Sequence, residues 1–481
     1  MKSISKLCLQ SLLALSALHL AQPADSATSA EYEALVKQSD HRKRQENRIL
    51  EEAQRWAKNN RAPEARLLDE VRMHVNLSPR HRVLRPILER MLAAAQPAQS
   101  TPQWQELYYY RLLNLDPQNK AYQTKLAALL RAKHGGASAE QVSQAYRWLN
   151  DGFNRWDEGK TKEALQLFKQ AALPKSPELN AIYAYHLRDS GQIEEAKAVL
   201  EKFAGQRDYL DWIDQTLTEI NSAETVVNAR FPEEDKLAAR IKLGELARAD
   251  QVIKGMSESP MKHWHRAKWF EKQGQYHPAS KEYQAYYQGR WRKELSGFVP
   301  VVYKAQLEDI NSLDLIALKF RTSTELIRKV NQNYPYDWVE TYRMLVIPVI
   351  RHDLTWPTPV TGYVSSHFGY RLHPIRGTWR LHEGIDIETA PGTPAFGTAS
   401  GTVAKAWYDS ACGNTLRIQH PNLGIQAVYC HGEKLLVKAN QAVKPGTKVM
   451  ITGNTGSSSA SNHLHFGVMK NGAYTDPMDW L

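Results

Sequence analysis

The spacing of apolar residues along the 481-residue chain changes twice and divides the sequence into three regions. From about residue 28 to 295, apolar positions recur at helical spacing, and the pattern predicts helices throughout. Residues 298–350 combine two short apolar runs of strand type with two amphipathic helices. Beyond residue 355, short alternating runs such as Thr415 to His420 and Ile425 to His431 predict strands, and these two form a hairpin. The length also suggests about three domains.

The first residues have the pattern of an export signal. Lys2 and Lys6 precede an apolar run from Leu7 to Leu20, and small and polar residues follow. This run is shorter than the roughly 20 residues that span a bilayer as a helix. Residues 1–27 are therefore predicted to be a secretory signal peptide, with an uncleaved anchor as the alternative. The mature chain is expected not to span a membrane, and to work in the periplasm or a secreted cell envelope.

A weak repeat runs through the helical region. A Gly is followed five residues later by Ala and four residues further by a large apolar residue, at Gly159/Ala164/Phe168, Gly191/Ala196/Leu200, Gly244/Ala249/Ile253 and Gly274/Ala279/Tyr283. This pattern is similar to tetratricopeptide repeats, in which small residues let paired helices approach. Such units bury their apolar faces by stacking, so a solenoid is expected over residues 28–295. A protein partner bound on the helical repeats is one interpretation, and a rigid spacer is the other.

The middle region predicts a strand–helix–helix–strand unit. Its helices are Leu313 to Phe320 and Glu325 to Asn331, and its strands are Val299 to Tyr303 and Met344 to Pro348. Residues 298–350 resemble a degenerate LysM module, although Glu308-Asp309 stands where the family has Gly-Asp. The resemblance implies glycan binding, and the alternative is a structural remnant. The stretch from Leu354 to Pro359 is expected to be a linker.

Candidate metal chemistry lies in two short segments, Arg380-Leu-His-Glu-Gly-Ile-Asp386 and His463-Leu-His465. On a straight strand, His382 and Asp386 would lie roughly 13 Å apart, too far for one ion. His382 is therefore expected in a turn before a strand that Asp386 enters, with Gly384 permitting the bend. His463 and His465 alternate on a strand and share one face about 7 Å apart. One can bind a metal while the other faces a substrate.

The donor set favours zinc. Two imidazoles and one carboxylate suit tetrahedral Zn²⁺ with a fourth position open to water. Zinc lowers the pKa of such a water to about 7 and polarises a carbonyl, as amide hydrolysis requires. His382-Glu383 superficially resembles the start of a helical HExxH motif, but position 386 is Asp, so Glu383 is not assigned as a general base.

Further motifs stand before and between these segments in a fixed order. They include Phe368-Gly-Tyr-Arg371, Gly392-Thr-Pro394, Val428-Tyr-Cys-His431 and Gly453-Asn-Thr-Gly456. In this order they resemble the lysostaphin-type (LytM) zinc peptidoglycan endopeptidases, over about residues 355–481. The resemblance implies a mainly antiparallel β peptidase domain that holds one zinc ion in a groove. It also implies that peptidoglycan is the partner, and that its peptide cross-links are hydrolysed.

The resemblance assigns roles to particular residues. His382, Asp386 and His465 would be the zinc ligands, and His431 and His463 the pair that transfers protons and stabilises an oxyanion. Tyr429 alternates with His431 on the predicted strand and is expected to share its face, so Tyr429, His373 and Asn414 are expected to support the site. A non-haem iron site uses a similar donor set, but the neighbouring motifs and the predicted compartment disfavour it.

This sequence departs from the family pattern at Gly432, in the Pro-free loop from Ser457 to Asn462, and at Cys412 and Cys430. The first two affect the shape of the groove and leave every ligand in place. The alternative function is a non-catalytic protein that binds the wall or activates another hydrolase. Retention of all five site residues favours the enzyme.

Cys412 and Cys430 lie near the ends of the predicted hairpin. In an oxidising compartment they could form a disulfide, and the alternative is a pair of buried thiols.

The overall charge agrees with a secreted wall enzyme. The chain has 62 Lys and Arg against 51 Asp and Glu, a formal net charge of +11. This excess favours an anionic polymer or envelope surface. No nucleic-acid partner is expected, because the basic residues are dispersed and the signal peptide opposes it.

Overall fold

The computed structural model describes a defined part of the chain, namely residues 48–58, 67, 87, 90–91, 120–204, 211–305, 313–335, 339, 343–359, 362–372, 379–459 and 461–481. The predicted signal peptide and His373 lie outside the described residues. Residues 48–58 are helical, as the sequence predicted.

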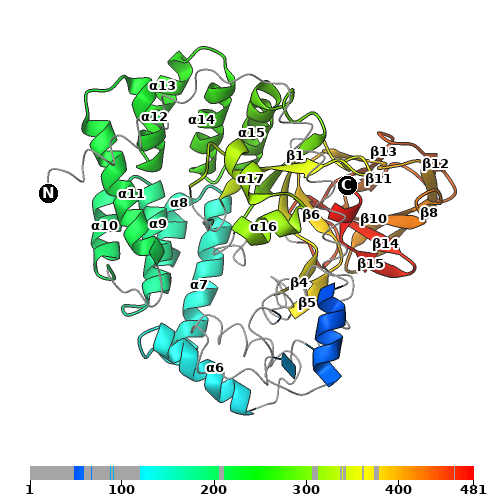
Figure 1. Cartoon of the computed structure of the whole chain (residues 1–481), viewed down its shortest axis with the longest axis horizontal. Helices are drawn as coiled ribbons and strands as arrows, with labels where there is room; N and C mark the ends of the chain where they lie inside the picture. Colours follow the sequence, from blue (N-terminus) through cyan, green and yellow to red (C-terminus); the bar gives the residue numbers. More distant parts are fainter. Residues whose placement is uncertain are drawn as a thin grey trace.

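A succession of helices forms what we call the helical arm. Its members are α6 (Lys120–Lys133), α7 (Ala139–Asp157), α8 (Thr161–Ala171), α9 (Pro177–Asp189), α10 (Ile193–Glu201), α11 (Asp211–Asn228), α12 (Glu233–Lys242), α13 (Leu246–Gly255), α14 (Pro260–Glu271) and α15 (Tyr276–Arg290). Figure 1 shows these helices curving along one side of the molecule, with the strands on the other side.

The repeat explains how these helices pair. The four repeat alanines have no exposed surface, and the large apolar residues that follow them are at most 3% exposed. The repeat glycines adopt positive φ between paired helices, as at Gly191 (78°) and Gly244 (70°). A Cβ atom added to Gly244 would lie 2.4 Å from the backbone nitrogen of Gly191, so only glycine allows these two turns to meet.

The middle region forms the predicted strand–helix–helix–strand unit, which we call the βααβ unit. It consists of β1 (Phe298–Lys304), α16 (Leu313–Lys319), α17 (Thr324–Val330) and β2 (Met344–Ile350). Ser323 caps α17, because its side chain accepts the backbone N–H of Leu326. The two strands pair antiparallel along their whole length.

Both faces of the β1–β2 pair are covered by apolar side chains. Alternate residues such as Val302 and Val346 pack in a core with α14 and α15, whereas Val301 and Ile347 join the core that continues into the C-terminal domain. Successive side chains of β1 and β2 point to opposite faces. One face packs on the helical arm and the other on the β domain, so the strand pair lies between them.

The C-terminal domain is built mainly from antiparallel strands. They are β3 (Tyr363–Ser366), β4 (Gly369–Leu372), β5 (Trp379–His382), β6 (Ile385–Glu388), β7 (Pro394–Phe396), β8 (Gly401–Asp409), β9 (Gly413–His420), β10 (Ile425–Gly432), β11 (Lys434–Leu435), β12 (Ala442–Val443), β13 (Lys448–Ile451), β14 (His463–Lys470) and β15 (Ala473–Thr475). The largest sheet has the order β12-β8-β9-β10-β14-β6-β3-β1-β2, with β15 beside β14. The predicted hairpin is present as β9 and β10.

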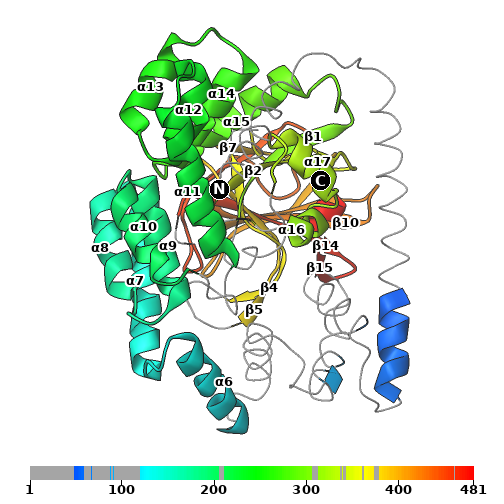
Figure 2. The ribbon, with the colours of Figure 1, turned by 60° about the vertical axis from the view of Figure 1, so that its left-hand side comes forward.

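The βααβ unit is part of this sheet and not a separate body. β1 pairs parallel with β3 through Tyr303 and Val364. The guanidinium of Arg321, in the turn between α16 and α17, forms ion pairs with Asp476 at 3.2 Å and Asp479 at 3.0 Å. Figure 2 shows α7 to α13 of the helical arm along one side, with the strands beside them.

The stretch expected to be a linker is packed against the domain. Leu354 is 1% exposed, and its N–H donates to the carbonyl oxygen of Trp480 at 2.7 Å. Thr355 likewise donates to Thr398. The segment still connects the two regions, but Leu354 is buried and the N–H groups of Leu354 and Thr355 are bonded within the domain.

Helix α15 ties the arm to the sheet through polar contacts as well as the shared core. Ser280 donates to the carbonyl oxygen of Gly362, Gln284 to that of Pro300, and Tyr286 to that of Val330. Within the described part of the chain, no helix is both long enough and apolar enough to cross a bilayer.

Candidate metal centre

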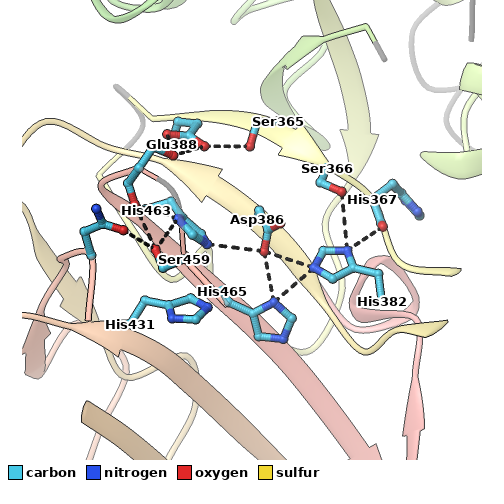
Figure 3. A network of polar contacts seen from close by, with 12 residues as sticks. Ser365, Ser366, His367, His382, Asp386, Glu388, His431, Ser459, His463 and His465 are labelled. Atoms are coloured by element: carbon cyan, nitrogen blue, oxygen red, sulfur yellow. Dashed lines mark hydrogen bonds and ion pairs between the residues drawn. The ribbon is translucent and has the colours of Figure 1, made fainter. Parts of the chain in front are cut away.

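Three predicted ligands converge at one point of the β domain (Figure 3). The Nε2 atom of His382 lies 3.0 Å from Oδ1 of Asp386 and 3.1 Å from Nδ1 of His465. Oδ1 of Asp386 lies 2.9 Å from Nδ1 of His465. Each residue offers one ligand atom, and the three atoms lie within 4.8 Å of one another.

Strand pairing accounts for this convergence. Asp386 on β6 and His465 on β14 are direct partners across an antiparallel pair. His382 ends β5, and the chain turns at Gly384 before β6 begins, close to the predicted arrangement. Gly384 is required for space: an added Cβ would lie 2.3 Å from the carbonyl oxygen of Phe466 and 2.9 Å from Nε2 of His465.

The donor chemistry fits a cation at this point. Nδ1 of His382 lies 2.7 Å from the backbone oxygen of His367. A carbonyl oxygen only accepts hydrogen bonds, so Nδ1 carries the hydrogen and Nε2 of the neutral ring presents a lone pair. That lone pair faces a carboxylate oxygen and another imidazole nitrogen. Three electron-rich atoms this close together suit a metal ion, and the contact to His367 fixes the required tautomer.

The pKa of Asp386 reflects the same cluster. Burial by itself would raise the pKa of this carboxyl group. When His382 is protonated, its charge and its hydrogen bond, together with the hydrogen bond from His465, outweigh burial and hold the pKa well below its usual range. Asp386 is therefore an anion at neutral pH, as a metal ligand must be.

His431 and His463 stand beside the three ligands. Their ring centroids are 4.7 Å apart, and His431 is 6.1 Å from the ring of His465. Nδ1 of His431 donates to the backbone oxygen of Thr455 at 2.9 Å, and Nδ1 of His463 to that of Ser461 at 3.0 Å. In the neutral form of each ring, the lone pair is therefore on Nε2.

The electrostatic surroundings keep His431 neutral. Burial, and then the neighbouring His463 and His465, lower its pKa to about 4. At neutral pH its Nε2 is therefore available as a proton acceptor. Nε2 of His463 lies 3.7 Å from Oδ1 of Asp386, which places this ring at the edge of the cluster.

A backbone irregularity presents His431 to the site. His431 has a positive φ of 66°, which is unusual for a residue other than glycine. The pairing of β9 with β10 shifts register between Tyr429 and Gly432 at this point. The N–H of His431 donates to the carbonyl oxygen of Cys412 at 2.7 Å.

The predicted supporting residue Asn414 donates from Nδ2 to the carbonyl oxygens of Gly432 and Glu433. These contacts hold the irregular backbone.

Tyr429 is not placed where the sequence suggested. The register shift breaks the alternation that would have put it on the face of His431. Its ring packs on Phe466, and its hydroxyl donates to the carbonyl oxygen of Phe396 at 3.0 Å. Tyr429 packs in the domain core, and a supporting role for it at the site stays a prediction.

The two cysteines are adjacent thiols in the structure. They are not bonded to each other, but a hydrogen bond between the side chains lowers the pKa of Cys412, and the same contact together with burial raises that of Cys430. The disulfide stays a prediction for an oxidising compartment.

Some functional groups were missed by sequence reasoning. His367 is buried, as an ordinary core histidine would be, but its backbone oxygen orients His382. Glu388 lies on the same strand face as Asp386 and contacts two serines. The signal that could have found Glu388 is its position two residues after a ligand on a strand.

Two imidazoles and a carboxylate on a mainly β domain, with two more histidines alongside, define a candidate mononuclear metal centre of the hydrolase type. Residues 380–477 match the model of peptidase family M23, and residues 155–206 match a tetratricopeptide repeat model. The C-terminal part of the chain is thus an M23 (LytM-type) domain, and the helical arm contains a tetratricopeptide-like repeat. Both resemblances are confirmed.

Relatives are similar to the chain in the C-terminal part. A protein from Haemophilus influenzae described as an uncharacterized metalloprotease is 38% identical over 125 residues, which are 26% of each chain. The DD-carboxypeptidase/endopeptidase Mpg of Neisseria meningitidis is 37% identical over 115 residues, 24% of this chain and 26% of that one. The peptidoglycan DD-endopeptidase ShyC of Vibrio cholerae is 36% identical, with the same coverage. The chain therefore spans about a quarter of the length of these relatives.

A solved structure of a zinc-containing peptidase from Vibrio cholerae is 32% identical, with a TM-score of 0.25. The similarity covers 29% of this chain and 44% of that one.

Proposed function

We propose that this protein is a zinc-dependent endopeptidase that hydrolyses peptide cross-links of bacterial peptidoglycan. The observation that carries the proposal is the convergence of His382, Asp386 and His465, with two histidines anchored beside them through backbone carbonyls. The M23 match and the peptidoglycan-acting relatives support the substrate.

The residues divide into two groups by what their atoms can do. His382, Asp386 and His465 would hold one zinc ion. Bound there, zinc would polarise the scissile carbonyl and lower the pKa of a water molecule. His431, which is neutral at neutral pH, would accept a proton from the attacking water and return it to the leaving amine. His463, whose ring lies beside that of His431, would donate from Nε2 to the developing oxyanion when both of its ring nitrogens carry a proton.

The remaining parts of the chain fit work at the cell wall. In this proposal, residues 1–27 direct export to the periplasm or a secreted envelope, and the βααβ unit, over residues 298–350, binds glycan as a LysM-like module. The helical arm binds a protein partner or acts as a spacer. The formal charge of +11 supports retention on an anionic envelope.

The test is digestion of purified peptidoglycan by the zinc-loaded mature chain, with the released muropeptides separated and identified by mass. We expect cross-linked dimers to fall and monomers to rise by the matching amount, and chelation to abolish the change. The masses would also name the bond that is cut. Unchanged muropeptides at full zinc occupancy would contradict the proposal and favour a non-catalytic protein that binds the wall or activates a hydrolase.

A further inference from the structure

Glu388 is a second carboxylate on the metal-binding face of β6, and the proposed reaction does not use it. Glu388 follows Asp386 by two residues, so the two side chains leave the strand on the same face. Its direct partner across the β6–β14 pair is His463. Glu388 is not one of the three residues whose ligand atoms meet, so it is not a metal ligand in this geometry.

The carboxylate of Glu388 binds the segment that precedes β14. The hydroxyl of Ser461 donates to Glu388, at 3.0 Å from each carboxylate oxygen. The hydroxyl of Ser365 on β3 donates to Oε1, also at 3.0 Å. Asn462, which follows Ser461, makes a further contact at the end of β6. Its Nδ2 atom donates to the carbonyl oxygen of Thr389.

The same segment orients His463. The carbonyl oxygen of Ser461 accepts Nδ1–H of His463 at 3.0 Å, and the hydroxyl of Ser459 donates to that carbonyl at 3.1 Å. Glu388 thus reaches His463 through Ser461: the hydroxyl of this serine binds the carboxylate while its carbonyl binds the imidazole. Figure 3 shows Glu388, Ser459 and His463 close together, beside Asp386 and His382.

The contacts of Glu388 tie its carboxylate to the domain itself. Both oxygens accept serine hydroxyls, one from β3 and one from the segment that precedes β14. The side chain of Ser461 is exposed, so without Glu388 this serine would lose the contact that fixes it to β6.

We propose that Glu388 is a positioning residue for His463. By holding Ser461, it fixes the tautomer with hydrogen on Nδ1 and directs Nε2 of His463 toward the metal-binding cluster. This inference rests on the proposed peptidase function for its effect on turnover, but the effect on the tautomer of His463 does not depend on that function.

The contacts provide matched variants in the full-length protein. Glu388→Ala removes the acceptor, and Glu388→Gln keeps a carbonyl oxygen that can accept one serine hydroxyl. Ser461→Ala removes the link to His463, whereas Ser365→Ala removes a bond from Glu388 to β3 only. Glu433→Ala, which alters an exposed carboxylate of the same domain, is the control for a general loss of negative charge.

On a soluble cross-linked muropeptide, we expect Glu388→Ala to lower kcat about 30-fold, with KM within about twofold and zinc content unchanged. Ser461→Ala should lower kcat about tenfold, Glu388→Gln about threefold, and Ser365→Ala less than twofold. The double variant Glu388→Ala/Ser461→Ala should be no worse than Glu388→Ala alone, because both residues act along one chain of contacts.

The tautomer is read independently from the ring-nitrogen chemical shifts of ¹⁵N-histidine-labelled protein, with His463→Gln used to assign the His463 signals. We expect the hydrogen-bonded Nδ1–H signal of His463 to be lost or averaged in Glu388→Ala and retained in Ser365→Ala. An unchanged signal and unchanged kcat in Glu388→Ala would overturn the proposal, and so would fully additive losses in the double variant. If wild-type protein cuts no substrate, the proposed function fails, and the nitrogen shifts still decide the role of Glu388.

Discussion

The helical arm and the β domain assemble their interiors in opposite ways. In the arm, each helix contacts mainly the next helices along the chain, as in the Phe153–Phe168 ring pair between α7 and α8. In the β domain, the nitrogen atoms of His382 and His465 meet at 3.1 Å although the residues are 83 positions apart. A change in the arm should therefore have a local and graded effect, whereas loss of one group from the site should remove a function altogether.

The largest effect is expected from His382→Ala. The variant lacks the Nε2 atom of His382, so Asp386 and His465 remain as the two ligands. Two ligands are too few for tight zinc binding. We expect zinc content to fall below about 10% and wall hydrolysis to fall at least about 1,000-fold, because bound zinc would supply the polarised carbonyl and the acidified water. Elemental analysis and muropeptide release measure the two losses. Helical circular dichroism should stay unchanged, and a collapse of the arm would contradict its independence from the site.

His431→Ala should separate chemistry from metal binding. His431 lies outside the set of three ligand atoms, so zinc content should stay within about 20% of wild type. Loss of the proton-transferring imidazole should lower kcat about 100- to 1,000-fold. His431→Asn also removes the imidazole, and adopts the positive φ at this position more readily than Ala. Equal losses in the two variants would assign the effect to the imidazole. Wild-type turnover in either would contradict the proposed role.

The site was largely predictable because its ligands lie in short motifs whose residue types carry the chemistry. Asp386 and His465 could be placed on strands from alternation alone. Tyr429 could not be placed correctly, because the prediction assumed a regular strand, and the positive φ of His431 interrupts it. Neither His367 nor Ser461 could be found, because each orients a histidine through its backbone oxygen, which side-chain identity does not reveal.

The fold was predictable within each region but not between regions. Helical periodicity indicated the arm, and the strand–helix–helix–strand pattern indicated the βααβ unit. The parallel pairing of Tyr303 with Val364, which makes one sheet of two regions, depends on a long-range contact that no local pattern reports. The ion pairs of Arg321 with Asp476 and Asp479 are equally remote in sequence.

Two glycines in the arm, Gly159 and Gly244, test how much a contact between neighbouring helix pairs contributes to the stability of the arm. Gly159 and Gly244 both have positive φ, of 74° and 70°. A Cβ on Gly159 would meet nothing within 4 Å, whereas one on Gly244 would lie 2.4 Å from Gly191. We expect Gly159→Ala to cost about 1 kcal/mol of unfolding free energy, from the backbone conformation alone. Gly244→Ala should cost about 3 kcal/mol, because a steric clash is added.

Urea unfolding followed by helical circular dichroism measures both costs, and zinc content and kcat serve as controls. Neither variant should change zinc content or kcat at temperatures well below the transition. Equal costs for the two variants would contradict the close approach of the turns at Gly191 and Gly244. Loss of zinc from either would show that the arm and the site are coupled more strongly than their packing indicates.

The effect that is smallest at neutral pH is a dependence of arm stability on pH, to which His134 contributes. This residue is 1% exposed, its Nδ1 lies 2.8 Å from the hydroxyl of Ser176, and burial lowers its pKa to about 4. Between pH 6.5 and 4, the unfolded chain binds a proton on His134 that the folded arm does not, so acid destabilises the arm in this window. His134 contributes at most about 1.4 kcal/mol per pH unit to the slope. His186 and His265 contribute in the same direction, because burial lowers the pKa of each to about 4 as well.

His134→Gln keeps a polar group near Ser176 but cannot titrate. The slope of unfolding free energy between pH 6.5 and 4 should therefore be smaller in this variant, whereas the two proteins should respond alike above pH 7. Helical circular dichroism in urea at several pH values gives both slopes. An identical slope below pH 6.5 would mean that other groups carry the acid sensitivity of the arm. A reduced slope would show that one buried imidazole tunes the arm, far from the histidines that form the site.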